Sequence, residues 1–514
     1  MSSFGVSWKG GSRRFVSALG VAAVSLVFAG VSWGSSAPYN PAADGYSMYN
    51  LTSQTGVRAW WDAGYTGQGV DVAVIDTGVS PVQGLNNPGQ VVNGPDLSLE
   101  SQSPNLTNLD TNGHGTFMAG LIAGHDPGVA APYSSAPASA YMGVAPDARI
   151  ISLKVATADG GVDVSQVIAA IDWVVQHAQD PGFNIRVINL SFGTNSLQPY
   201  QRDPLAYAAE QAWKAGIVVV AAAGNTGYQR GHDAPGLADP AYDPTVIAVG
   251  GYNTGGNGGP RNDTMGAYSA SSAGCGSCKN PDFVAPGTHI QGLRDPGSYI
   301  DQNHPEGVLD DRYFRGSGTS EATAITSGIV ALILQRFPNL TPDQVKNFIA
   351  DNARRLPGAD TQAQGAGEID LGKLLTLKKP ANFSQSFKNS TGAGSLELSR
   401  GTDHISLNGV ALTGEEDIFG NPFNAAAMAQ AEAAGLSWSG GVWNGSSWSG
   451  SSWSGSSWSG SSWSGSSWSG SSWSGNSWSG NSWSGSSWSG SSWSGSSWSG
   501  SSWSGVVWAG GSWD

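Results

Sequence analysis

The sequence predicts an α/β fold, a three-layer sandwich in which helices cover both faces of a mostly parallel central sheet. Between residues 56 and 377, short apolar runs alternate with longer stretches of helical character. Apolar runs that are almost continuous are typical of strands buried on both faces, and regular alternation with helices favours a parallel sheet. Functional residues in such folds follow the carboxyl ends of the strands, which tells us where to search.

Each element follows from its own pattern. The helix predicted to begin at Ser320 is apolar on almost every side, so we expect it to be buried. Pro342 after Thr341 predicts a further helix, with Thr as the cap and Pro in the first turn. Residues 365–374 are predicted as a closing turn and a short element. The predicted strands are 70–75, 150–155, 187–190, 217–222 and 246–249, and the longer predicted helices are 164–179, 204–215 and 320–337.

The N-terminus predicts export. Lys9, Arg13 and Arg14 precede an uncharged apolar stretch, 15–29, which small residues follow. This is the layout of a secretory signal peptide, which we assign to residues 1–37. The apolar stretch is short for a membrane span of about 20 residues, although an uncleaved anchor is the alternative. We therefore expect a secreted or cell-surface protein, with residues 38–55 as an N-terminal arm.

The C-terminus has an unusual composition. The chain has 22 Trp against 14 Phe and 14 Tyr, and 16 of the Trp recur every fifth residue after Leu436. Residues 436–514 thus form a Ser-Ser-Trp-Ser-Gly repeat tail, for which disorder and a β-solenoid are both open. Residues 378–435 are interpreted as a connector of uncertain order, with a helical piece at 424–434. The net charge of −14 without a basic cluster argues against nucleic-acid binding.

The only two cysteines lie close together in the sequence, as Cys275-Gly-Ser-Cys278. A thioredoxin-like redox pair requires a βαβ context, which this Gly/Ser-rich surrounding lacks. A structural zinc requires four ligands, and no second cysteine pair is present. In an exported chain, we favour a local disulfide between Cys275 and Cys278.

Three polar residues stand out by their local context. Asp76 directly follows an apolar strand, His114 lies between two glycines before an apolar helix, and Ser320 opens the buried helix. Taken singly, each has a simpler structural explanation: a turn Asp, a loop His and a helix-capping Ser. Their significance comes from their combination.

The order Asp, His, Ser, each with its flanking residues, resembles the subtilisin-like serine peptidases. The resemblance extends over roughly residues 56–377 and rests on several blocks besides the three residues. Asn225 ends a block that is similar to the family's oxyanion block, and Asp282 begins the segment that precedes the Ser block. The similar blocks are 67–78, 143–146, 189–193, 221–225 and 282–287.

This resemblance implies a serine endopeptidase acting on protein or peptide substrates. Ser320 would be the nucleophile, His114 the general base and Asp76 the group that orients the imidazole. Asn225 and the Ser320 N–H would form the oxyanion hole. An extended substrate would pair with one segment and place its side chain against a second one. These predicted substrate-binding residues are Ser191, Phe192 and Gly193, and Ala222, Ala223 and Gly224.

The resemblance implies no cofactor for the chemistry, and it leaves room for structural calcium. The insertion 125–141 shows no convincing carboxylate cluster, while Asp239 and Asp243 are candidates for a weaker site. The chain also departs from the family, because Glu321 and Ala324 stand where Met and Pro are usual. The alternative function is a catalytically inactive surface-adhesion or wall-polymer-binding protein that works through its Trp-rich tail.

Overall fold

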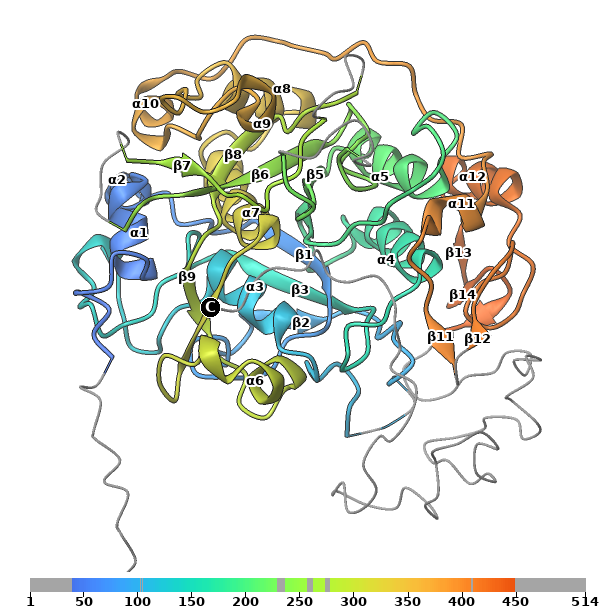
Figure 1. Ribbon diagram of the computed structural model, residues 1–514, viewed down its shortest axis with the longest axis horizontal. Coiled ribbons are helices and arrows are strands. Elements are labelled where there is room, and N and C mark those ends of the chain that lie inside the picture. The colour runs from blue at the N-terminus through green and yellow to red at the C-terminus, as the bar shows by residue number, and fades with distance from the viewer. Residues whose placement is uncertain are drawn as a thin grey trace, which may run out of the picture. The chain divides into compact units, whose positions relative to one another are not determined.

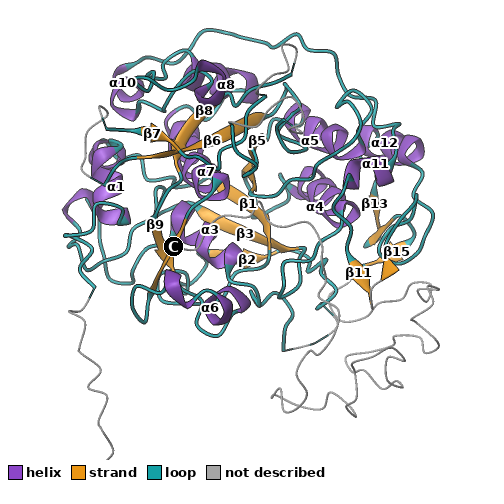
Figure 2. Cartoon of the chain, in the orientation of Figure 1, coloured by secondary structure: helices purple, strands orange, loops and turns teal. Residues whose placement is uncertain are grey.

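The computed structural model describes residues 39–448, apart from gaps at 102, 104, 229–235, 257–261, 273–277 and 408–409. The predicted signal peptide and the repeats after Trp448 lie outside the described residues. Within residues 39–448, the central strands are enclosed by helices (Figure 1 and Figure 2).

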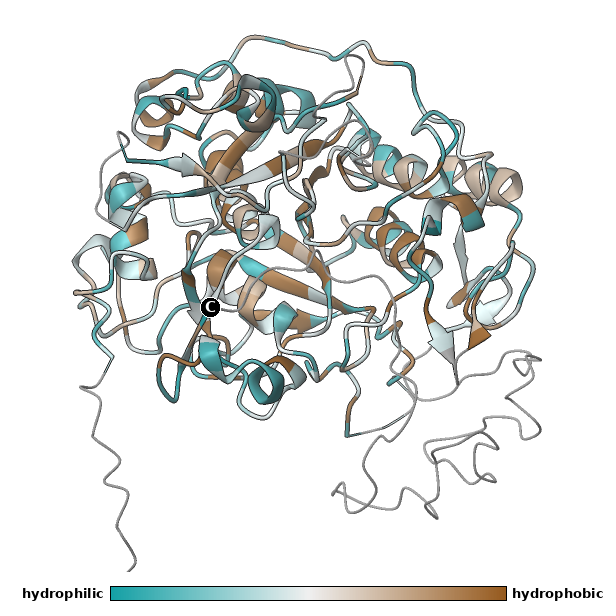
Figure 3. Cartoon of the chain, viewed as in Figure 1, coloured by the Kyte–Doolittle hydropathy of each residue, from teal (hydrophilic) through white to brown (hydrophobic). Residues whose placement is uncertain are grey.

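An eight-stranded sheet occupies the centre, as the alternating pattern predicts. Its order is β2-β3-β1-β4-β5-β6-β7, β8 also pairs with β6, and only the pairing of β6 with β7 is antiparallel. The strands β1 and β5 are buried along their whole length, and Figure 3 shows how apolar the central strands are. The strands are β1 (Asp71–Asp76), β2 (Val91–Asn93), β3 (Arg149–Lys154), β4 (Ile185–Leu190), β5 (Val218–Ala222), β6 (Ile247–Asn253), β7 (Thr264–Met265) and β8 (Phe283–Pro286).

Helices form the two outer layers. The helices α4 (Val164–His177) and α5 (Pro204–Lys214) pack against each other and form one of these layers. The helix α3 (His114–Ala123) belongs to the other layer. The predicted buried helix, α7 (Thr319–Arg336), packs against α3 and completes that layer. The predicted three-layer fold is confirmed.

Local capping explains where the main helices begin. Asp163 and Gln166 form a capping box at α4, and Asp203 caps α5 ahead of Pro204. The predicted helix after Thr341 is α8 (Pro342–Ala350), which also has a capping box. Within the described part of the chain, no helix has the length and apolar character needed to cross a bilayer.

The predicted N-terminal arm is folded in its described part. The helix α1 (Met48–Gln54) buries Met48 and Leu51, and the Met48 N–H donates to Gln291 Oε1 at 2.9 Å. Gln291 belongs to an antiparallel hairpin formed by β9 and β10. The other elements of this part are α2 (Val57–Asp62), η1 (Tyr133–Ser135), β9 (Ile290–Leu293), α6 (Tyr299–Asn303), η2 (Pro305–Gly307), β10 (Tyr313–Gly316), α9 (Thr361–Gln364) and α10 (Leu371–Thr376).

Residues 395–448 form what we call the C-terminal cap, which packs against α4 and α5. Residues 378–435 are predicted to be a connector, yet from residue 395 the chain contributes apolar side chains to the main core. Residues 378–394 contain no helix or strand. The cap elements are α11 (Leu396–Arg400), β11 (Ser406–Leu407), β12 (Val410–Ala411), α12 (Ala425–Ala433), β13 (Trp438–Ser439), β14 (Val442–Trp443) and β15 (Ser446–Ser447).

The first three tryptophans of the repeat belong to this cap. Trp438 donates from Nε1 to Ala169 O at 3.0 Å, and Trp443 donates to Asp172 Oδ2 at 2.7 Å, so both bind α4. The rings of Trp443 and Trp448 lie 5.5 Å apart. The repeat therefore begins as a small antiparallel sheet on the domain, whereas its remaining residues lie outside the described part.

Candidate active site

Asp76 is the last residue of β1, at the centre of the sheet's carboxyl edge. Its side chain is 1% exposed. Asp76 Oδ1 accepts hydrogen bonds from the Thr77 N–H at 2.8 Å and from His114 Nδ1 at 2.8 Å. The structure thus brings two of the predicted catalytic residues into direct contact.

His114 is the first residue of α3 and is 3% exposed. Both flanking glycines are required by close approach of other chain segments. A Cβ on Gly113 would lie 2.5 Å from Ser298 Oγ, and a Cβ on Gly115 would lie 2.1 Å from Gly78 O. Gly113 also has a φ of +105°, which favours glycine. The two glycines therefore allow the imidazole to reach Asp76.

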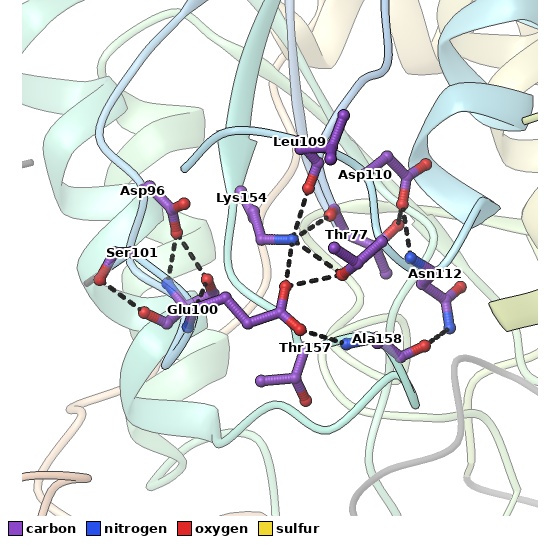
Figure 4. A network of polar contacts seen from close by, with 12 residues as sticks. Thr77, Asp96, Glu100, Ser101, Leu109, Asp110, Asn112, Lys154, Thr157 and Ala158 are labelled. Atoms are coloured by element: carbon purple, nitrogen blue, oxygen red, sulfur yellow. Dashed lines mark hydrogen bonds and ion pairs between the residues drawn. The ribbon is translucent and has the colours of Figure 1, made fainter. Parts of the chain in front are cut away.

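Asp110 fixes the two backbone segments that carry Asp76 and His114. Its Oδ1 accepts from Thr77 Oγ1 at 2.7 Å and from the Gly113 N–H at 2.7 Å. Its Oδ2 accepts from the Thr116 N–H at 2.7 Å. Asp110 therefore ties the turn after β1 to the first turn of α3 (Figure 4). The sequence contains no signal that would have identified Asp110, because an Asp in a polar loop is usually exposed.

Lys154, the last residue of β3, contacts the same region, as Figure 4 shows. Its side chain is fully buried, and its Nζ donates to Thr77 O at 3.1 Å and to Leu109 O at 2.7 Å. Glu100 Oε2 lies 2.8 Å from the same nitrogen. A buried ammonium requires such partners, so we assign Lys154 to holding the loops around Asp76.

Ser320 lies in the first turn of α7, which begins one residue earlier than predicted, at Thr319. The helices α3 and α7 pack against each other and bring Ser320 to the same edge of the sheet. Ser320 Oγ donates to Ser191 O at 3.4 Å, and Ser191 Oγ donates to Ser320 O at 3.1 Å. The predicted nucleophile therefore lies beside the predicted substrate-pairing segment.

Asn225 is oriented by the residue that precedes Ser320. Its Oδ1 accepts from the Thr319 N–H at 2.8 Å and from Thr319 Oγ1 at 2.9 Å. These two bonds place the carbonyl oxygen of the amide toward Thr319, with Nδ2 on the other side of the group. Such an orientation suits the predicted use of Asn225 as a donor to an oxyanion.

The two predicted substrate-binding segments share a neighbour that the sequence analysis did not identify. A Cβ on Gly193 would lie 2.6 Å from Ala238 Cβ, and a Cβ on Gly224 would lie 3.4 Å from it. Ala238 therefore packs between them. Of the other predicted residues, Ser191 and Phe192 follow β4, Ala222 ends β5 and Ala223 follows it; residues 229–235 lie outside the described part.

Asp239 and Asp243 are the candidates for a calcium site, and Cys275 and Cys278 are the candidates for a disulfide. Asp239 Oδ2 lies 3.2 Å from Ser399 Oγ, and Asp243 Oδ1 accepts from the Thr245 N–H at 2.7 Å. In the described part of the chain, no three His, Cys, Asp or Glu side chains are arranged to hold a metal ion, and structural calcium at Asp239 and Asp243 stays a prediction. Cys278 is disulfide-bonded, while Cys275 lies outside the described residues and its pairing stays a prediction.

Burial and neighbouring charges change the pKa values of the site. Burial alone would lower the pKa of His114, but the Asp76 carboxylate and its hydrogen bond, with Glu321 and Asp110, raise it. Burial raises the pKa of Asp76, although His114 opposes this effect. The raised pKa makes the His114 imidazole a stronger base than a free histidine.

Residues 67–367 match the subtilase family. The chain belongs to this family of serine-type endopeptidases. It is 36% identical over 308 residues to serine protease AprX of Bacillus subtilis, covering 59% of this chain and 66% of that protein. It is 31% identical over 309 residues to subtilisin DY of Bacillus licheniformis, covering 60% of this chain and 91% of that protein. The chain thus spans just under two thirds of AprX.

The subtilase match contains every predicted catalytic and substrate-binding residue and ends before the C-terminal cap. Both departures from the family pattern, Glu321 and Ala324, lie inside this match. Glu321 follows Ser320, the predicted nucleophile, is 2% exposed, and has an Oε2 without a hydrogen-bond partner in the described part of the chain. Burial raises the pKa of Glu321 to about 7, although His114 opposes this.

Replacing Glu321 by Met should move the acid limb of the kcat/KM profile of this subtilase to lower pH. Ionised Glu321 raises the pKa of His114, so removing the carboxylate lowers that pKa. His114 must be neutral to act as a base, and a lower pKa keeps it neutral in more acidic solution. A pH series of kcat/KM measures the shift. The variant Glu321→Gln, which keeps the size of the side chain, should show the same change, and an unchanged acid limb in both variants would contradict the assignment.

Proposed function

We propose that this chain is a secreted serine endopeptidase that hydrolyses peptide bonds through Ser320, His114 and Asp76. The observation that carries the proposal is the 2.8 Å hydrogen bond between His114 Nδ1 and Asp76 Oδ1, buried at the sheet edge beside the helix that bears Ser320. The family membership supports the reaction type.

In the proposed mechanism, Ser320 Oγ attacks the peptide carbonyl while His114 accepts its proton. Asp76 orients the imidazole and stabilises the imidazolium. The Ser320 N–H and Asn225 Nδ2 stabilise the oxyanion, after which His114 protonates the leaving amine and an acyl-enzyme remains. Water, deprotonated by His114, then cleaves the ester and regenerates Ser320.

The proposed substrate is an extended polypeptide. The backbone of residues 191–193 follows β4 at the sheet edge, next to Ser320, where it can pair with an added strand.

Export is supported by the basic and apolar N-terminal pattern and by the disulfide at Cys278. Cleavage between residues 29 and 38 of the expressed precursor, measured by mass spectrometry, tests it.

Labelling with a phosphonofluoridate tests the proposed chemistry directly, because this reagent reacts with activated serine nucleophiles. We expect one label, on Ser320, and its loss in Ser320→Ala. Since an unactivated Ser is a weak nucleophile, His114→Ala should also slow labelling strongly. Labelling of the folded protein at another residue, or none at all, would contradict the proposal.

The alternative function, adhesion through the Trp-rich tail, gains no support from the described repeats. Trp438, Trp443 and Trp448 are used in packing against the domain and one another. Contact of the later repeats with wall polymers remains a prediction about residues outside the described part.

A further inference from the structure

The C-terminal cap contacts the loop that follows β4 and carries the proposed substrate-pairing segment. Thr194 Oγ1 donates to Ser399 O at 2.5 Å, directly after Gly193. The Asn195 N–H donates to Asp403 Oδ2 at 3.1 Å, so backbone and side chain of the loop are both fixed. The residues around α11 thus hold one side of the proposed substrate path.

The same helix holds the loop that follows β3. Arg400 Nε donates to Asp163 Oδ1 at 2.6 Å, and both side chains are buried. The remaining guanidinium nitrogens of Arg400 donate to Gly414 O at 2.6 Å and to Glu416 O at 2.5 Å, within the cap. Arg400 is therefore a fixed connection between the cap and the end of this loop.

The strand order places the two loops held by the cap on either side of the proposed active site. In the sheet, β1 lies between β3 and β4, so the loops after β3 and β4 flank Asp76 on its two sides. The loop after β3 also contacts the site directly, because Asn112 Nδ2 donates to Ala158 O at 2.7 Å. An extended substrate that crosses the triad would run between these two loops. Their separation therefore affects how well such a substrate fits.

We propose that α11 sets the separation of these two loops, with Arg400 and Gly401 as positioning residues for extended substrates. This inference rests on the proposed peptidase function. It assigns a role in substrate binding to residues beyond the 67–367 family match. A preorganised substrate path lowers the ordering cost of binding, so the effect should appear in KM for long peptides.

A glycine pair in the cap offers a matched test. Gly401 has a φ of +65°, and a Cβ there would lie 2.0 Å from Asn195 O. Gly435 has a φ of +66°, and a Cβ there would meet no atom within 4 Å. The variants Gly401→Ala and Gly435→Ala therefore both place a side chain at a positive φ, and only the first displaces the loop after β4.

Kinetics would be compared for a peptide with four residues before the scissile bond and for an ester with one. We expect Gly401→Ala to raise KM for the peptide on the order of tenfold relative to the ester, with kcat less affected. Gly435→Ala should leave the ratio of the KM for the peptide to the KM for the ester unchanged. An unchanged ratio in Gly401→Ala, or equal changes in both variants, would overturn the proposal.

A second pair avoids new backbone strain and serves if Gly401→Ala does not fold. Thr194→Val removes the hydroxyl that donates to Ser399 O, whereas Thr194→Ser retains it. We expect the peptide-to-ester ratio to change in the Val variant and to return in the Ser variant; an equal ratio in both would count against the proposal. Wild-type protein that cleaves neither substrate would instead refute the proposed function.

Discussion

Replacing Asp76 by Asn should lower kcat about ten-thousandfold and leave the fold intact. Asp76 Oδ1 accepts from both the Thr77 N–H and His114 Nδ1. An amide in this place can present an N–H to His114 instead, which favours the imidazole tautomer that cannot accept the Ser320 proton. Steady-state kinetics measures the loss, and thermal unfolding measures the fold.

The other end of the same strand provides the control. Asp71 begins β1 and pairs with Arg149, so Asp71→Asn makes the same chemical change away from the site. We expect its kcat to remain close to that of the wild type. Burial raises the pKa of Asp76, which means that the folded protein disfavours its ionised form. Replacing Asp76 by the neutral Asn should therefore not lower the unfolding temperature. A kcat reduced less than tenfold in Asp76→Asn would show that His114 is oriented by other groups.

The sequence predicted the central strands well because parallel strands buried on both faces consist of apolar residues. The prediction for 150–155 differs by one residue from β3, Arg149–Lys154. The predicted strand 246–249 ends earlier than β6, because Gly250 and Gly251 interrupt the apolar run. A Cβ on Gly251 would lie 2.5 Å from the Tyr268 hydroxyl, so glycine there reflects close packing within a continuing strand.

The catalytic candidates were predictable because each lies in a distinctive local motif, whereas their supports were not. Asp110, Lys154 and Arg400 are charged, and charged residues are usually exposed. Only the tertiary structure shows that each is buried among specific partners, such as Asp163 some 237 residues from Arg400. The interpretation of 378–435 as a connector failed to anticipate the cap for this reason. Its polar composition hides the few residues that bind the domain.

Replacing Arg400 by Met should lower the free energy of unfolding by about 3–5 kcal/mol, because it leaves Asp163 buried and unpaired. Arg400 and Asp163 are 0% and 1% exposed. Burial alone would raise the pKa of Asp163, but the Arg400 guanidinium holds it below its ordinary value. Urea unfolding at pH 7 measures the loss. For comparison, Glu306→Gln removes one partner of an ion pair whose two side chains are both exposed, Glu306 with His304, and should cost about 1 kcal/mol or less.

The pH dependence separates the lost ion pair from lost packing. A carboxylate whose folded pKa is lowered contributes stability above its unfolded pKa of about 3.9, and this contribution disappears as the pH falls through the folded pKa. The difference between wild type and Arg400→Met should therefore be largest near pH 7 and shrink in acid, where Asp163 is protonated in the variant. The double variant Asp163→Asn/Arg400→Met removes both charges and should recover part of the loss. A difference that stays constant with pH, and no recovery in the double variant, would mean that Arg400 stabilises the cap through packing and its bonds to Gly414 and Glu416 rather than through Asp163.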